Sequence, residues 1–194
     1  ATNAGPAFGF LIFILVVSGC SAWYHIDTAV QDDGTRVVTM DNNEIKVEGA
    51  RKYHAESLEG NYVVERRLFL NLRRITAPDG KASYEFMVEY SGKDWLKIEK
   101  GRSLELVVDG RSTLFSAVGE VGREMDPSGE WFTEWLDYPV DRDFLFRIAT
   151  AQTIEVIVNG HEGEVRGFFD GDNFKAIRRF VAEYVETDGQ GPPS

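Results

Sequence analysis

The sequence contains a single cysteine, Cys20, among 194 residues, so no disulfide can form within the chain. Histidine is also scarce, and the three histidines, His25, His54 and His161, lie far apart. Neither His-x-x-x-His nor Cys-x-x-Cys spacing occurs, so the sequence predicts no metal site. We therefore expect the fold to be held by its hydrophobic core alone.

Motifs that mark common enzymes and nucleotide-binding proteins are lacking as well. There is no Gly-x-Ser-x-Gly nucleophile elbow, no P-loop and no Gly-x-Gly-x-x-Gly after a predicted strand. The stretch Asp170-Gly171-Asp172-Asn173 resembles part of a calcium loop, but the spaced acidic positions and the closing glutamate do not follow. We interpret it as a turn with a helix cap, and we expect no cofactor.

Positive charge is in the minority. The chain has 21 Lys and Arg against 32 Asp and Glu, which gives a formal net charge of -11. A chain this acidic repels the phosphates of DNA and RNA, so we expect no nucleic-acid partner. Hydrophobic residues at 43% and aromatic residues at 12% are typical of a folded chain rather than a disordered one.

The longest uncharged apolar run covers residues 8–17. Ten residues make about 15 Å of helix, whereas a bilayer core needs about twenty residues. The run is therefore too short to span a membrane, but its length matches the hydrophobic region of a secretory signal. It ends in Val17-Ser18-Gly19-Cys20, which resembles the lipobox of bacterial lipoprotein precursors.

This resemblance implies a division of the N-terminal region. Residues 1–19 would be the signal peptide, Cys20 would carry the lipid, and residues 20–35 would form a lipidated tether. The mature protein would be held in the bacterial cell envelope, facing the periplasm. Since Ser21 is not the aspartate that retains many such proteins in the inner membrane, the resemblance favours the outer membrane. The alternative is that residues 8–17 form a buried strand or helix and that Cys20 is an ordinary core residue.

Residues 36–187 predict one α+β domain, followed by a disordered tail at 188–194. We expect mainly antiparallel β-sheet, either as a sheet or as a sandwich, with two C-terminal helices flanking a β-hairpin. Residues 36–40 and 44–48 look like a hairpin around a turn at 41–43. Residues 61–76 and 83–90 predict a long hairpin, with a bulge near 68–70 where the alternation is imperfect.

Further along the chain, residues 94–98 predict a short strand and residues 119–129 predict an exposed loop. Asp109-Gly110 and Asn159-Gly160 are typical two-residue hairpin turns. Two helices are predicted near the end of the chain, with Asp141 and Asp172 as their N-caps.

The aromatic stretch at 130–138 holds the candidate ligand or partner surface. Glu130, Glu134 and Asp137 lie beside Trp131 and Trp135, and aromatic rings next to carboxylates suit sugar binding. One hypothesis is therefore a periplasmic hydrolase or glycan-binding protein. The other interpretation is that these residues belong to the core or to a covered sheet edge.

We favour a non-enzymatic function. The hypothesis is a membrane-anchored envelope lipoprotein that acts as a binding or scaffolding module, with the lipid on Cys20 as its membrane contact. Its partner would be another envelope protein, bound through a sheet edge or the aromatic strand. No residue is assigned a catalytic role, and the oligomeric state is left open.

Overall fold

The computed structural model describes residues 24–49, 52–54 and 62–186, with backbone only for 52–54 and 62–64. The predictions for residues 1–19, for Cys20 and for 188–194 lie outside the described residues. The strands are β1 (His25–Val30), β2 (Arg36–Asp41), β3 (Glu44–Val47), β4 (Lys52–His54), β5 (Tyr62–Val64), β6 (Arg66–Thr76), β7 (Ala82–Gly92), β8 (Leu104–Val108), β9 (Arg111–Phe115), β10 (Val118–Met125), β11 (Phe132–Val140), β12 (Ile154–Gly160) and β13 (Gly163–Phe168). The helices are α1 (Arg142–Thr150) and α2 (Gly171–Tyr184).

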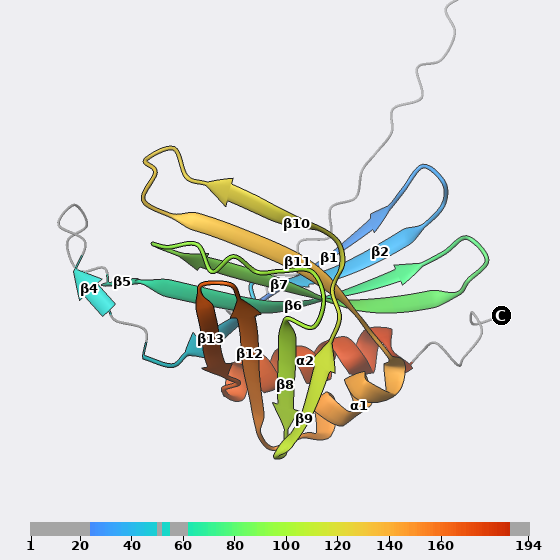
Figure 1. Cartoon of the computed structure of the whole chain (residues 1–194). Coiled ribbons are helices and arrows are strands. Elements are labelled where there is room, and N and C mark those ends of the chain that lie inside the picture. Colours follow the sequence, from blue (N-terminus) through green and yellow to red (C-terminus); the bar gives the residue numbers. More distant parts are fainter. Residues whose placement is uncertain (1–23, 50–51, 55–61, 187–194) are drawn as a thin grey trace, which may run out of the picture.

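Eleven of these strands form one antiparallel sheet in the order β10-β11-β7-β6-β3-β13-β12-β8-β9, with β2 also beside β6 and β1 beside β2. The sheet curls into a half-barrel, so that β8, β9, β12 and β13 cross steeply in front of β6 and β7 in Figure 1. The predicted mainly antiparallel sheet with helices is therefore present. Strand pairing is continuous through this sheet rather than divided between two sheets; β4 and β5 pair separately.

The sheet forks along one edge of β6. β2 pairs with the second half of β6, from Thr76 to Leu72, and β3 pairs with the same edge at Phe69 and Leu68. β2 and β3 therefore follow one another along β6 and do not form the predicted hairpin. The register shifts by one residue between them, where Asn42 adopts a left-handed conformation (φ 61°) that asparagine tolerates better than most residues.

The core lies inside the curl. Leu70, Phe86 and Tyr138 from β6, β7 and β11 face Leu106 and Val156 from β8 and β12. Both faces of β6 are buried between Leu68 and Leu72. This burial explains the imperfect alternation, since β6 and β7 pair without a register shift from Arg66 to Thr76. The predicted bulge at 68–70 is therefore absent from this pair.

The two helices close one end of the half-barrel and pack against each other (Figure 1). Asp141 caps α1 by accepting a hydrogen bond of 2.6 Å from the Phe144 backbone N–H, as predicted. The cap of α2 is Asp170 and not Asp172. Asp170 accepts from the backbone N–H of Asn173 while the Asn173 side chain accepts from Asp170 N–H, which makes a reciprocal capping box.

Four further sequence predictions are corrected. Residues 25–30 were predicted to be tether but form β1, paired with β2 along its whole length. Residues 119–129 were predicted to be an exposed loop, but residues up to 125 belong to β10, whose irregular sequence does not reveal its pairing with β11. Residues 94–98 make only a single bridge at Ile98. The β12–β13 turn is His161-Glu162, because Gly160 still pairs with Gly163.

Candidate functional site

The predicted surface residues do not gather in one place. Glu130 precedes β11 and is exposed, whereas Glu134 points inward with Leu136 and Tyr138. Trp135 and Asp137 lie on the opposite, outer face, because successive residues of a strand alternate. Trp131, just before the strand, is half-buried. The sheet thus separates the three carboxylates that the sequence brings together.

Glu134 is fully buried and works as a structural acceptor. Its two carboxylate oxygens accept the backbone N–H groups of Lys97, at 2.7 Å, and Ile98, at 2.8 Å. The Arg123 guanidinium lies 3.3 Å from the same carboxylate and also donates to the Ile98 carbonyl. Glu134 therefore fixes the connection between β7 and β8 to the inside of the sheet.

The neighbouring inward residue, Tyr138, is equally inaccessible. Its hydroxyl lies 2.8 Å from Ser103 Oγ, and Ser103 Oγ donates to the Glu99 carbonyl. Burial raises the pKa of Tyr138 to about 12, so the phenol stays protonated at neutral pH. This pair holds the same connection in place and presents no nucleophile to solvent.

Asp137 belongs to an ion-pair cluster on the outer face. Arg73 Nη2 lies 2.6 Å from Glu85 and 2.5 Å from Asp137, so one guanidinium neutralises carboxylates from β7 and β11. The pKa of Arg73 is raised: burial lowers it, but the hydrogen bonds and charges of the two carboxylates outweigh that effect. The arrangement is a cross-strand support, as expected for opposite charges on adjacent strands.

Two other carboxylates, Asp41 and Glu89, lie on this face, and sequence reasoning did not bring them together. Burial raises the pKa of Asp41 and of Glu89 above their ordinary values. The charge of Asp27 raises the Asp41 pKa further, and the charge of Asp41 acts in the same direction on Glu89, while Arg67 lowers the Glu89 pKa. The sequence gives no signal for this cluster, since its members come from β1, β2 and β7.

Exposed apolar side chains concentrate at the β10–β11 edge. Trp135 is 41% exposed, and its indole occupies the space where a Cβ on Gly122, its cross-strand partner, would stand. Val118 and Met125, at the two ends of the edge strand β10, are 43% and 56% exposed. We call Val118, Met125 and Trp135 the β10 edge surface. They are the exposed apolar residues at the place where the sequence predicted an aromatic contact.

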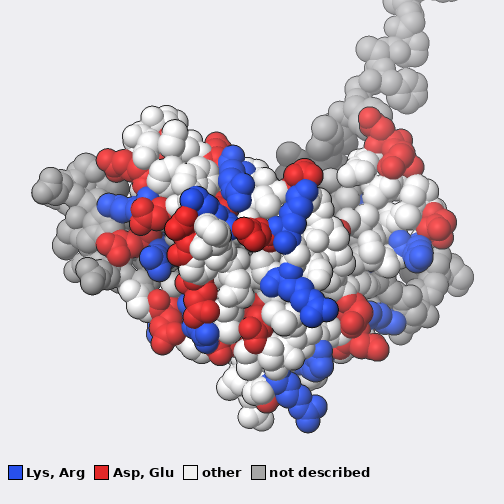
Figure 2. Space-filling view, viewed as in Figure 1, with Lys and Arg blue, Asp and Glu red and all other residues white. Residues whose placement is uncertain are grey.

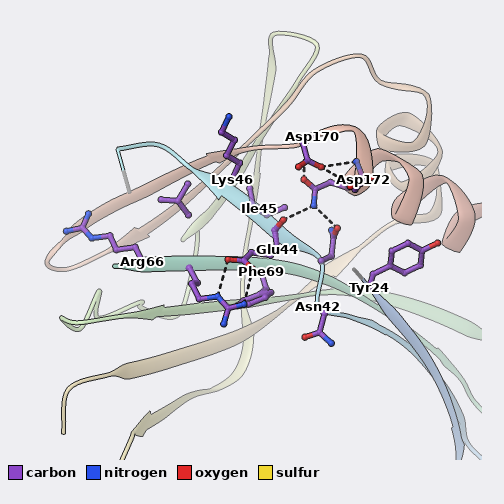
Figure 3. A pocket seen from close by; sticks show the side chains of 13 residues that line it. Tyr24, Asn42, Glu44, Ile45, Lys46, Arg66, Phe69, Asp170 and Asp172 are labelled. Carbon is purple, nitrogen blue, oxygen red and sulfur yellow. Dashed lines mark hydrogen bonds and ion pairs between the residues drawn. The ribbon is translucent and has the colours of Figure 1, made fainter. Parts of the chain in front are cut away.

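A groove of about 710 Å³ lies at the fork of the sheet. Figure 3 shows Tyr24 at one end of it and Arg66 at the other, with the first turn of α2 above. The lining residues come from four separate parts of the chain: Tyr24, Asn42, Asn43, Glu44, Ile45, Lys46, Val47, Arg66, Arg67, Phe69, Asp170, Asp172 and Asn173. Only the fold unites them, so the sequence could not predict this groove.

One wall of the groove is fixed by paired charges. Arg67 donates two hydrogen bonds to Glu44, of 3.0 and 2.9 Å, and its guanidinium lies 4.8 Å from the centre of the Phe69 ring. Hydrogen bonding and charge from Glu44 raise the pKa of Arg67 against the opposing effect of burial. Lys46 and Arg66 are exposed, and neither side chain forms an ion pair with a described residue.

No group of three metal-ligating side chains occurs in the part of the chain that the structure describes. His25 pairs with Asp27 at 2.9 Å, His161 lies in the β12–β13 turn, and the His54 side chain lies outside the described residues. Within the same residues, no helix is long and apolar enough to cross a membrane.

Comparisons with protein-family models, with curated proteins and with solved structures found no match. Glu134 and Asp137 support the structure, whereas the β10 edge surface and the groove are accessible to partners. Acidic and basic side chains alternate over the face shown in Figure 2, and neither sign forms a single large patch there.

Proposed function

We propose that this protein is a lipoprotein of the bacterial cell envelope, anchored by a lipid on Cys20, whose domain binds or scaffolds another envelope protein without catalysing a reaction. The observation that carries the proposal is the uncharged apolar run at 8–17 that leads directly into Val17-Ser18-Gly19-Cys20, the pattern that resembles a lipobox. Cleavage before Cys20 would leave every described strand and helix intact.

The β10 edge surface is the proposed partner contact. β10 ends the sheet, so one edge of its backbone has no neighbouring strand within the described sheet. Such an edge can accept a strand from another chain. Val118 and Trp135 on the outer face and Met125 on the inner face supply apolar area beside it. Exposed apolar groups next to unpaired backbone are typical of a protein contact.

The geometry favours binding over hydrolysis at the predicted carboxylates. A glycosidase needs two carboxyl groups facing each other across a cleft. Glu134 faces the core, Asp137 is paired with Arg73 on the other face, and Glu130 stands in an exposed turn. The three side chains therefore do not form the pair that this chemistry requires.

The test is intact-mass measurement on the membrane fraction of cells that express the full precursor, beside a Cys20→Ala variant. We expect a species that begins at Cys20 and carries added lipid mass, and we expect the variant to lack it. An unmodified chain that retains residues 1–19 would refute the anchor. A photo-crosslinking residue at Met125 should then capture an envelope protein, whereas one at Lys81, in the β6–β7 turn, should not.

A further inference from the structure

The proposed anchor leaves very little chain between lipid and domain. Three residues separate Cys20 from Tyr24, the first described residue. Four Cα–Cα steps of 3.80 Å span about 15 Å at most. Tyr24 lines the groove, and its hydroxyl lies 3.5 Å from Arg179 of α2. A lipid on Cys20 would therefore hold the groove close to the bilayer surface.

The charges around the groove differ from those of the whole chain. Glu44 is paired with Arg67, and Asp172 is paired with Lys175 at 2.8 Å. Asp170 is occupied as the cap of α2. Lys46 and Arg66 remain as cations without an ion pair to a described residue. Four cations, Lys46, Arg66, Arg67 and Lys175, therefore stand against three carboxylates in and beside the groove, which is close to neutral in a chain of net charge -11.

The composition of the groove also suits an amphipathic ligand. The apolar part of the lining consists of Tyr24, Ile45, Val47 and Phe69. Lys46 and Arg66 line the same groove together with polar side chains. The volume of about 710 Å³ lies within the range of small-molecule sites. Lysine and arginine are the side chains that bind phosphate, through charge-assisted hydrogen bonds.

We propose that the groove faces the bilayer to which Cys20 is anchored, and that Lys46 and Arg66 bind the phosphates of lipid headgroups. This inference rests on the proposed lipid anchor. The tether raises the effective concentration of headgroups at the groove, so weak individual contacts suffice for occupancy. The contacts also offset the repulsion between an acidic domain and an anionic membrane surface.

The first test uses the full lipidated protein in mild detergent, titrated with short-chain phosphatidylglycerol and followed by native mass spectrometry. We expect Lys46→Glu with Arg66→Glu to weaken binding about tenfold or more. Lys81→Glu with Arg111→Glu is the matched control, because it changes net charge equally at exposed positions away from the groove. Equal weakening in both double variants, or no binding to the parent protein, would overturn the proposal.

The second test measures orientation and does not depend on charge reversal. Cys20 with its lipid has no free thiol, so Lys46→Cys or Lys81→Cys can carry a single fluorophore in vesicles that contain nitroxide-headgroup lipid. Lys81 precedes Ala82, which pairs with Thr76, and Thr76 lies about 23 Å along β6 from Phe69 of the groove. We expect several-fold stronger quenching at position 46. Equal quenching, or stronger quenching at position 81, would overturn the orientation.

Intact masses of the same samples separate the two proposals. A chain without lipid on Cys20 would overturn the anchor and this inference together. Lipid on Cys20 without groove-dependent binding or quenching would overturn only the inference and leave the proposed function standing.

Discussion

Asn173, at the start of α2, donates a hydrogen bond of 2.8 Å from Nδ2 to Oδ1 of Asn43, at the fork of the sheet. Asn43 in turn donates its backbone N–H to Asn71 of β6 and its Nδ2 to the Leu70 carbonyl. All three asparagines are buried. This chain of hydrogen bonds attaches the last helix to the point where the sheet divides.

Replacing Asn173 should therefore loosen the fork. We expect Asn173→Ala to lower the free energy of unfolding by about 1–3 kcal/mol, because Asn43 Oδ1 loses its partner in a buried site and the capping box is broken. Urea denaturation monitored by tryptophan fluorescence would measure the change. Lys175→Ala, at an exposed position of the same helix, is the control; an equal loss there would contradict the assignment.

Glu134→Gln tests the buried acceptor. The amide offers one oxygen where two backbone N–H groups now bind, and its NH₂ group would face a donor. We expect a loss of about 3 kcal/mol in the free energy of unfolding, since a buried charge network is broken. Glu130→Gln should be nearly neutral, as Glu130 is exposed. Thermal unfolding of both variants measures the difference in stability. A Glu134→Gln variant as stable as the parent would refute this structural role.

The raised pKa of Glu89 predicts a stabilising substitution. A carboxyl whose folded pKa lies above its unfolded value contributes stability that is fully present below the unfolded pKa and is lost as pH rises through the folded pKa. Glu89→Gln should thus unfold at higher urea than the parent at pH 7 and match it near pH 3. Glu124→Gln, exposed on β10, should show no such difference between pH values. A lower midpoint for Glu89→Gln at pH 7 would mean that the attraction to Arg67 outweighs burial.

Gly160 is required by close packing. A Cβ at this position would lie 2.0 Å from the Leu96 carbonyl oxygen, a backbone atom that cannot rotate away. We expect Gly160→Ala to destabilise the domain by about 1–3 kcal/mol or more. At Gly171, the first residue of α2, a Cβ meets no atom within 4 Å, so Gly171→Ala should be neutral or slightly stabilising. Calorimetric unfolding of the two variants gives the comparison.

Local patterns predicted part of the fold. The alternation of Tyr84, Phe86, Val88 and Tyr90 predicted β7, and the apolar spacing of Phe144, Leu145 and Ile148 predicted α1, because one face of each element is buried. β10 was missed because Gly119, Glu120, Gly122 and Glu124 form no alternating pattern. Its place in the sheet depends on pairing with β11.

Local sequence patterns could not predict the fork or the candidate site. Asp41-Asn42-Asn43 has the composition of a turn, yet β2 and β3 continue along one edge of β6 because that edge offers partners to both. Most of the aromatic stretch at 130–138 lies in β11, but the faces of its carboxylates follow from strand register and the curl of the sheet. The groove depends on the fork and therefore could not be predicted either.

The fork also determines the order in which the strands can pair during synthesis. β3 pairs on one side with β6, which follows it closely in the sequence, and on the other with β13, near the end of the chain. During synthesis, the second edge of β3 stays unpaired until Gly167 and Phe168 have emerged. The two branches of the sheet can therefore join only after Phe168 has emerged. Truncation before β13 would leave this edge of β3 unpaired in the middle of the sheet, where strands of other chains can pair with it and cause aggregation.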